Sequence, residues 1–290
     1  MASVLLSNDP AGTARRNDPP PRASLARLLE TPKAQLLVVF ALLAAVALPN
    51  EGIVPAGSRL MLAALAAVAV DLPFVLRAAR GWRFPTSALL SGVIVGMVLD
   101  TNTPFVVVAG ASALAILSKR LLRTPREHVF NPAALALLLA ALAFGSGESW
   151  WGALGNLPTP FAVVLVVLGS VLVDRMNKFP LVLSFGAVYF ALLTALAFVN
   201  PGLVAEQFRD PFVQAALFFA LFMLTDPPTS PNRYLEQVVY GSLAATTAGA
   251  AQVFGAGQVY LLIGVLAANA WLAVHRWANR RWVQTGALAT

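Results

Sequence analysis

Ten apolar segments separated by short polar connections dominate this chain and constrain its fold more than any other feature. The chain is 58% hydrophobic and only 11% charged, whereas soluble domains carry about a quarter charged residues. A helix needs ~20 residues to cross a bilayer. We therefore expect an all-α membrane protein with about ten transmembrane helices. The apolar segments are 34–49, 59–76, 86–99, 105–118, 132–144, 159–173, 179–199, 212–224, 235–252 and 257–274.

The basic residues predict the orientation of these spans. With ten spans and a cytoplasmic N-terminus, 18 of the 20 Lys and Arg residues fall on the cytoplasmic side, and only Arg59 and Arg209 fall outside. The positive-inside rule favours this arrangement. We therefore expect a multi-pass protein of the inner (plasma) membrane with both termini cytoplasmic. The net charge of +7 then reflects topology and contact with membrane lipid, and nucleic acid is not an expected partner.

The ends of the chain differ in composition from the apolar segments. Residues 1–35 are polar, rich in Pro and Arg, and lack the short apolar core of a signal peptide. We expect a disordered cytoplasmic tail there. The other expected regions are a first five-helix repeat (36–144), an outside loop (145–158), a second five-helix repeat (159–277) and a cytoplasmic C-terminal tail (278–290).

Two short apolar segments share a sequence pattern at a spacing of 126 residues. Residues 83–104 and 209–230 both read R-x-P, a short apolar stretch and M-x-x-D-x-x-T, with five identities in 22 positions. Each copy would form the third span of a five-span unit. Because five is odd, the two units would have opposite orientations, which predicts two inverted five-helix repeats. Asp100 and Asp226 would then face opposite sides of the membrane.

The run TDPPTSP at 225–231 overlaps the end of the second copy. Proline lacks an N–H and clashes with the preceding turn, so this run cannot continue a helix. Polar groups freed at membrane depth must be buried in protein or line a polar cavity. We therefore expect a non-helical break whose polar groups approach Asn131 at the start of the fifth span. The alternative is an ordinary interfacial loop in which Asp226 caps the next helix.

Two segments, HVFNPAALALLL (128–139) and FMLTDPPTSP (222–231), resemble the RnfD/NqrB family of membrane proteins. Members of this family are membrane components of the Rnf electron-transport complex and of the sodium-translocating NADH:quinone oxidoreductase. They carry F-N-P-A at the start of the fifth span and T-D-P-x-T-S-P after the eighth. The segment SALLSGVIVGMVL (87–99) also resembles the family's third span, and the likeness covers roughly 36–275. The resemblance implies two inverted five-helix halves in a flavin-bearing subunit of a redox-driven ion pump.

The resemblance also bears on how a flavin would be held. In the family, a threonine in an S-G-A-T type motif between spans five and six takes covalent FMN. The corresponding loop here, 145–161, is short and lacks S-G-A-T, and only Thr159-Pro160 echoes the end of the motif. The chain is therefore similar to a short, stand-alone type of member. For such a member we expect FMN or riboflavin to bind without a covalent bond.

The candidate site residues follow from the two motifs and the repeat. An ionisable residue inside a membrane is a functional candidate by default. Asn131-Pro132 can equally be a plain helix start, and the hydroxyls of the break can simply cap the next helix. The candidates for an ion or solute pathway are Asp100, Thr103 and Asp226. The candidates for cofactor binding are Asn131, Pro132, Thr225, Asp226, Thr229, Ser230 and Thr159.

Three other polar features have simpler interpretations. We expect Asp71 to play a structural role at the cytoplasmic end of the second span, and His128 to be a solvated loop residue. The basic run 119–126 is expected to act as an orientation signal and a lipid contact.

The sequence offers no site for hydrolysis, phosphoryl transfer or metal catalysis. It has no cysteine, P-loop, Gly-rich nucleotide turn or H-E-x-x-H helix. Electrons would have to come from other redox or membrane subunits, so we expect a subunit that is not catalytic alone. The main hypothesis is an integral membrane subunit of a flavin-dependent electron-transfer system, with coupling to ion translocation left open. The alternative is a transporter or channel-like protein for a small polar solute on the same scaffold, because a fold does not define a function.

Overall fold

The computed structural model describes residues 31–78, 84–124 and 128–286. In these residues the regular structure is helical, and strand pairing is limited to two isolated bridges, Leu99–Glu148 and Arg123–His128. The expected all-α fold class is therefore confirmed. Most of the predicted N-terminal tail, residues 1–30, lies outside the described residues, as do Arg83 of the sequence repeat and Arg126 of the basic run.

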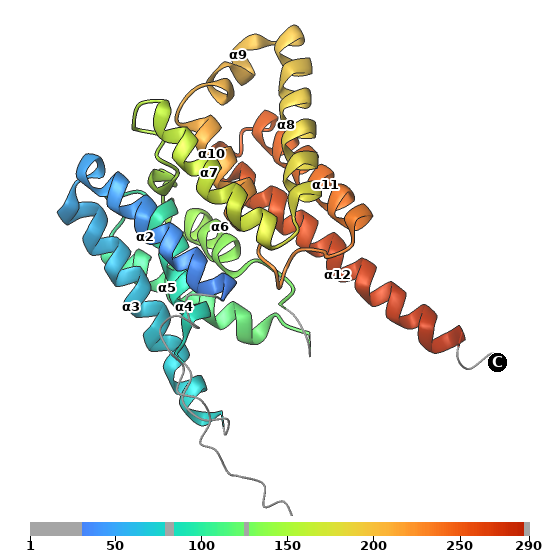
Figure 1. Ribbon diagram of the computed structural model, residues 1–290, viewed down its shortest axis with the longest axis horizontal. Helices are drawn as coiled ribbons and strands as arrows, with labels where there is room; N and C mark the ends of the chain where they lie inside the picture. Colours follow the sequence, from blue (N-terminus) through green and yellow to red (C-terminus); the bar gives the residue numbers. More distant parts are fainter. Residues whose placement is uncertain (1–30, 79–83, 125–127, 287–290) are drawn as a thin grey trace, which may run out of the picture.

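Ten helical segments run back and forth through the described part of the chain (Figure 1). Each apolar segment predicted from the sequence overlaps one of them. The segments are α2 (Pro32–Glu51), α3 (Ile53–Arg77), α4 (Thr86–Val98), α5 (Phe105–Leu121), α6 (Pro132–Phe144), α7 (Pro160–Arg175), α8 (Phe179–Val199), α10 (Phe212–Phe218) with the π-helix η3 (Phe219–Met223), α11 (Tyr234–Val253) and α12 (Tyr260–Gly286). Short helical turns lie in the connections: η1 (Trp151–Ala153), α9 (Pro201–Val204), η2 (Ala205–Phe208) and η4 (Gly257–Val259).

Four helical stretches are long and apolar enough to cross a membrane, which supports a membrane protein. They are α2, α3, α8 and the stretch Gly257–Asn279. By contrast, α4, α6 and α10 with η3 are apolar but shorter. Helix α6 has 13 residues and therefore rises only about 20 Å, less than the ~30 Å of a hydrocarbon core.

Proline determines where several helices begin. It occupies the first turn of α2, α6, α7 and α8, where its missing N–H would have no partner inside the helix. Thr31 and Asn131 cap α2 and α6, because their side-chain oxygens accept hydrogen bonds from the N–H groups of Ala34 and Ala134. At the other end of the chain, α12 continues to Gly286, through residues expected in the C-terminal tail.

The two halves of the bundle pack in corresponding ways. Helix α5 packs along α3 and α6 in the first half, and α11 packs along α8 and α12 in the second. The starts of α3 and α8, Ile53 and Phe179, are 126 residues apart, and so are the starts of α4 and α10, Thr86 and Phe212. This spacing equals that of the sequence pattern.

The two polar turns after α4 and η3 have the same backbone hydrogen bond but lie at opposite ends of α6. The N–H of Thr103 donates to the carbonyl of Asp100 (3.0 Å), and the N–H of Thr229 donates to that of Asp226 (3.1 Å). Asp100 also donates its N–H to Gly147, just beyond the C-terminal end of α6. Asp226 instead lines a cavity together with Asn131, at the N-terminal end of α6.

Helices α3 and α4 approach closely at Gly92. A Cβ added there would lie 2.5 Å from the carbonyl oxygen of Ala63 and 2.8 Å from the Cβ of Ala67. Small residues at such contacts let membrane helices pack by van der Waals contact.

Gly92→Ala is therefore expected to destabilise the protein by about 1–3 kcal/mol, because the backbone of α3 must move away from the added methyl group. The matched control is Gly110→Ala in α5, where an added Cβ meets nothing within 4 Å. That substitution should be neutral or stabilising by up to about 1 kcal/mol. The measurement is the thermal unfolding midpoint in detergent, and equal midpoints for the two variants would contradict the packing argument.

Candidate functional site

The chain leaves regular helix after η3 and forms a compact turn at 224–231, here called the break. The last π-type bond runs from the N–H of Leu224 to the carbonyl of Phe219 (2.9 Å), and π-turns in helices are frequent at functional sites. Further on, the N–H groups of Thr229 and Ser230 both donate to the carbonyl of Asp226. The expected non-helical break is therefore confirmed.

The hydroxyl groups of the break donate hydrogen bonds within the break or to the turn just before it. Thr225 Oγ1 donates to the carbonyl of Leu221 (2.7 Å), and Thr229 Oγ1 donates to Asp226 Oδ2 (3.0 Å). Ser230 Oγ donates to the carbonyl of Thr225 (3.4 Å). Helix α11 starts only at Tyr234 and has no side-chain cap. The alternative interpretation, in which Asp226 or the hydroxyls cap the next helix, is therefore wrong.

Two buried asparagines connect the break to α6 and α12. Asn131 Nδ2 donates to the carbonyl of Met223 (3.0 Å), and the N–H of Asn131 donates to Asn269 Oδ1 (2.7 Å). Asn269 Nδ2 donates to the carbonyl of Thr229 (3.0 Å) and also contacts the hydroxyl of Tyr240. The structure thus brings the break to Asn131, as expected. Sequence reasoning missed Asn269, although a single amide in the apolar stretch LLIGVLAANAWLAV is a detectable signal.

Two basic side chains donate hydrogen bonds to the C-terminal end of the break. Lys178, which precedes α8 and is 1% exposed, donates through Nζ to the carbonyl of Pro231 and to Asn232 Oδ1. Arg276 donates to the carbonyl of Ser230 (3.4 Å). Burial lowers the pKa of Lys178 to about 8, so the side chain stays mostly charged at neutral pH. Sequence reasoning counted Lys178 only as an orientation signal.

A cavity of about 370 Å³, here called the break cavity, opens beside Asp226. Its volume lies within the ~300–1,000 Å³ typical of small-molecule sites. The wall is mainly apolar and comes from α2, α4, α6, Met176 and Phe222, and it also includes polar residues. These polar residues are Lys33, Ser87, Ser91, Lys119, His128, Asn131 and Asp226.

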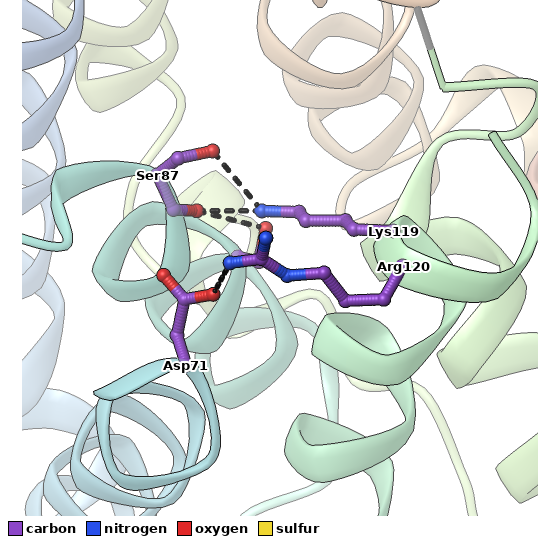
Figure 2. A network of polar contacts seen from close by, with 5 residues as sticks. Asp71, Ser87, Lys119 and Arg120 are labelled. Atoms are coloured by element: carbon purple, nitrogen blue, oxygen red, sulfur yellow. Dashed lines mark hydrogen bonds and ion pairs between the residues drawn. The ribbon is translucent and has the colours of Figure 1, made fainter. Parts of the chain in front are cut away.

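Lys119 and Arg120 of α5 have different partners (Figure 2), and of the two only Lys119 lines the break cavity. Lys119 Nζ donates to the carbonyl and hydroxyl oxygens of Ser87, at 2.7 and 3.2 Å. Arg120 pairs with Asp71 of α3 instead. Asp71 thus has a structural role, as expected, because its ion pair with Arg120 links α3 to α5. In the described residues no carboxylate forms a direct ion pair with Lys119, but the carboxyl group of Asp226 lines the same cavity and interacts electrostatically with Lys119.

His128 is not the solvated loop residue expected from the sequence. It is half-buried and lines the break cavity, and its Nδ1 has no hydrogen-bond partner in the described part of the chain. Burial lowers the pKa of His128, which favours the neutral ring at physiological pH.

The remaining candidates lie away from the break cavity. Asp100 Oδ1 accepts the N–H of Asn102 (2.7 Å), and the carbonyl of Thr103 accepts a hydrogen bond from Arg59 (2.8 Å), both at the opposite end of α6. Thr159 is exposed and donates to Asp210 (3.1 Å). The 16 residues of α7 separate Thr159 from Met176 of the cavity, a distance of about 24 Å along the helix. Of the cofactor candidates, Asn131, Pro132 and Asp226 line the break cavity. Thr225, Thr229 and Ser230 make hydrogen bonds that shape the break but do not line the cavity, and Thr159 lies apart.

The lining of the break cavity is suited to binding a small organic molecule. The described residues contain no group of three or more His, Asp or Glu side chains able to hold a metal ion. The cavity instead combines an apolar wall with cationic donors, a neutral imidazole and one carboxylate. Such a lining can hold a planar organic group by its faces and orient it by its polar edge.

A scan against protein-family models finds no match for this chain, and a search of curated proteins finds none either. The likeness to membrane components of the Rnf complex and the NADH:quinone oxidoreductase therefore remains a prediction from the motifs.

The buried amide of Asn269 provides a test of how the break is held. Asn269→Ala leaves the N–H of Asn131 and the carbonyl of Thr229 without their partners, and each buried orphan costs about 1–3 kcal/mol. We expect a clear loss of unfolding free energy, measured by thermal or denaturant unfolding. Asn279→Ala is the control, since Asn279 is an exposed residue of the same helix whose side chain contacts His275. Equal stabilities of the two variants would contradict this role of Asn269.

Proposed function

We propose that this protein is an integral membrane subunit of a flavin-dependent electron-transfer system, and that the break cavity binds FMN or riboflavin without a covalent bond. The supporting observation is that all three segments with the family resemblance line this one cavity. Segment 87–99 contributes Ser87 and Ile94, segment 128–139 contributes Asn131, and segment 222–231 contributes Phe222 and Asp226. These three segments are far apart in the sequence and were selected only for their resemblance to the family. Helix packing alone does not require that segments selected in this way line the same cavity.

The lining also suits the chemistry of a flavin. An isoalloxazine ring has two apolar faces and one edge with both hydrogen-bond donors and acceptors. Leu90, Ile94 and Phe222 offer an apolar wall, while Lys119 offers a cationic donor and Asp226 an acceptor. A cation near the ring stabilises the negative charge that accumulates on reduction. Electrons would reach the flavin from other redox or membrane subunits.

We further propose that the ten helical segments are ten spans in two inverted five-helix repeats. The equal spacing of helix starts, the corresponding packing and the opposite ends of the two turns support this arrangement. The basic residues support the orientation, because Lys119, Lys178, Arg233 and Arg276 all belong to the end of the bundle that contains the break. The break cavity would then open on the cytoplasmic side, with both termini in the cytoplasm.

Single cysteines in this cysteine-free chain test the topology. Arg123 and Asn102 are both exposed and belong to opposite ends of the bundle. Arg123→Cys should react with a membrane-impermeant maleimide only after the membrane is permeabilised, and Asn102→Cys should react in intact cells. Reaction of both variants from the same side would contradict the proposed orientation.

The visible spectrum of the purified protein tests the proposed cofactor. We expect flavin absorbance in the native protein and release of the flavin to the supernatant after acid precipitation, because Thr159 lies away from the cavity. Flavin that stays in the pellet would mean covalent attachment. Protein that binds no flavin even after incubation with FMN and riboflavin would contradict the proposal.

Asp226→Asn tests the electrostatic role of the break. The variant keeps the side-chain shape and the bond from Thr229, so the stability cost should stay below about 1 kcal/mol. Removal of a negative charge beside the ring should raise the flavin midpoint potential and lower electron transfer, as measured by redox titration and stopped-flow reduction. Asp174→Asn, at an exposed carboxylate on α7, is the control. An unchanged potential in Asp226→Asn would show that the charge does not act on the cofactor.

One observation favours transport of a small polar solute as the alternative function. The break cavity shares Ser87, Lys119 and His128 with a second cavity of about 220 Å³, which is also lined by Arg120 and Arg123. Adjoining cavities with a basic lining suit an anionic solute. Protein without flavin that takes up an anion when reconstituted in vesicles would support this function over electron transfer.

A further inference from the structure

A buried carboxyl group lies at the end of the bundle away from the break cavity. Glu148 is 2% exposed and belongs to the connection between α6 and η1. This connection pairs with the end of α4, because the N–H of Asp100 donates to Gly147 (2.9 Å) and the N–H of Trp150 donates to Val98 (3.1 Å). The backbone pairing on both sides of Glu148 fixes its side chain in the interior.

The carboxyl group of Glu148 has no counter-charge. Its Oε1 is buried without a hydrogen-bond partner, and none of the ion pairs found among the described residues involves Glu148. An isolated buried carboxylate is strongly unfavourable unless it is neutralised or binds a cation. Burial accordingly raises the pKa of Glu148 to about 7.

The side chain faces a cavity of about 20 Å³, enough for one water molecule or a small ion. Among the described residues that line this cavity, Tyr260 of α12 is the one titratable residue besides Glu148. Helix α10 contributes Phe212 and Ala215, and η4 contributes Gln258. Asp100 is the other charged residue in the paired backbone segments, and its carboxylate accepts a hydrogen bond from the N–H of Asn102.

Tyr260 also belongs to a chain of hydrogen-bonded neutral side chains in the second half of the bundle. The hydroxyls of Tyr260 and Tyr189 lie 3.1 Å apart, and the hydroxyl of Tyr189 donates to Gln207 Oε1 (3.3 Å). Gln207 and both tyrosines are buried. Carboxylate, hydroxyl and amide oxygens together form a ligand set for a hard cation and not for an anion.

We propose that Glu148 and this cavity form a binding site for a small monovalent cation, at the end of the bundle opposite the break cavity. A proton would neutralise the carboxylate directly. An alkali ion would occupy the cavity between Glu148 and the oxygens of Tyr260 and Gln258. The site uses no residue of the break cavity, so it does not depend on flavin binding.

The thermal unfolding midpoint between about pH 5 and pH 9, in choline chloride and in sodium chloride, tests this proposal. Because the pKa of Glu148 is raised in the folded protein from 4.5 to about 7, the folded state binds the proton more tightly than the unfolded state. The stabilisation is complete below the unfolded pKa and is lost as the pH rises through the folded pKa. In choline, the wild-type midpoint should therefore fall as the pH rises toward and past neutrality.

The isosteric variant Glu148→Gln should lose this pH dependence, whereas Glu206→Gln, at an exposed carboxylate, should keep it. Sodium that restores the wild-type midpoint above neutral pH, but not that of Glu148→Gln, would identify an alkali-ion site. A pH effect without a sodium effect would identify a proton site. Identical pH and sodium dependence of the wild type and Glu148→Gln would overturn the proposal.

Infrared spectroscopy of the Asp226→Asn variant gives a second measurement that needs no substitution of Glu148; this background is used because burial also raises the pKa of Asp226. The carbonyl band of a protonated carboxylic acid should disappear with a midpoint near pH 7 in choline. If every carboxyl group titrates near its ordinary pKa, the proposed site does not exist.

Discussion

The rest of the structure depends on the pairing of backbone groups at the break. Two prolines end the helical hydrogen bonding after η3, and the freed carbonyls of Met223 and Thr229 lie where water is excluded. Asn131 and Asn269 donate to these carbonyls, and Asn131 also caps α6. The side chains of Asn131 and Asn269 therefore provide hydrogen-bond partners for backbone groups at the break and at the start of α6, and Asn269 links both to α12. Because an unpaired buried polar group is costly, this pairing fixes how the two halves of the bundle meet.

The break also forms part of the wall of a cavity large enough for a ligand. This cavity lies beside the turn, and its wall is mainly apolar. Lys33 and Lys119 both line it, and Lys119 donates to Ser87. At the opposite end of α6, the carboxyl group of Glu148 is buried, and its Oε1 has no hydrogen-bond partner among the described residues.

Much of the fold was predictable from the sequence. Apolar length and proline placement predicted where helices form, because backbone groups in lipid must be satisfied within the helix. The break at 224–231 was predictable for the same reason. Part of the site was predictable too: Asn131 and Asp226 belong to short motifs. Asn269, Lys178 and the buried state of His128 were not, because each acquires its role from a partner far away in the chain.

The sequence by itself determined the helical segments, their order, the polar interruption and the bias of basic charge, since these follow from local composition and proline stereochemistry. Only the tertiary structure decided which polar groups share an environment. It placed Thr159 about a helix length from the other cofactor candidates, and it paired Asp71 with Arg120. It also buried Glu148 beside Tyr260. The reason is physical: burial and pairing depend on the distance between atoms in space, which helix packing sets and local sequence does not encode.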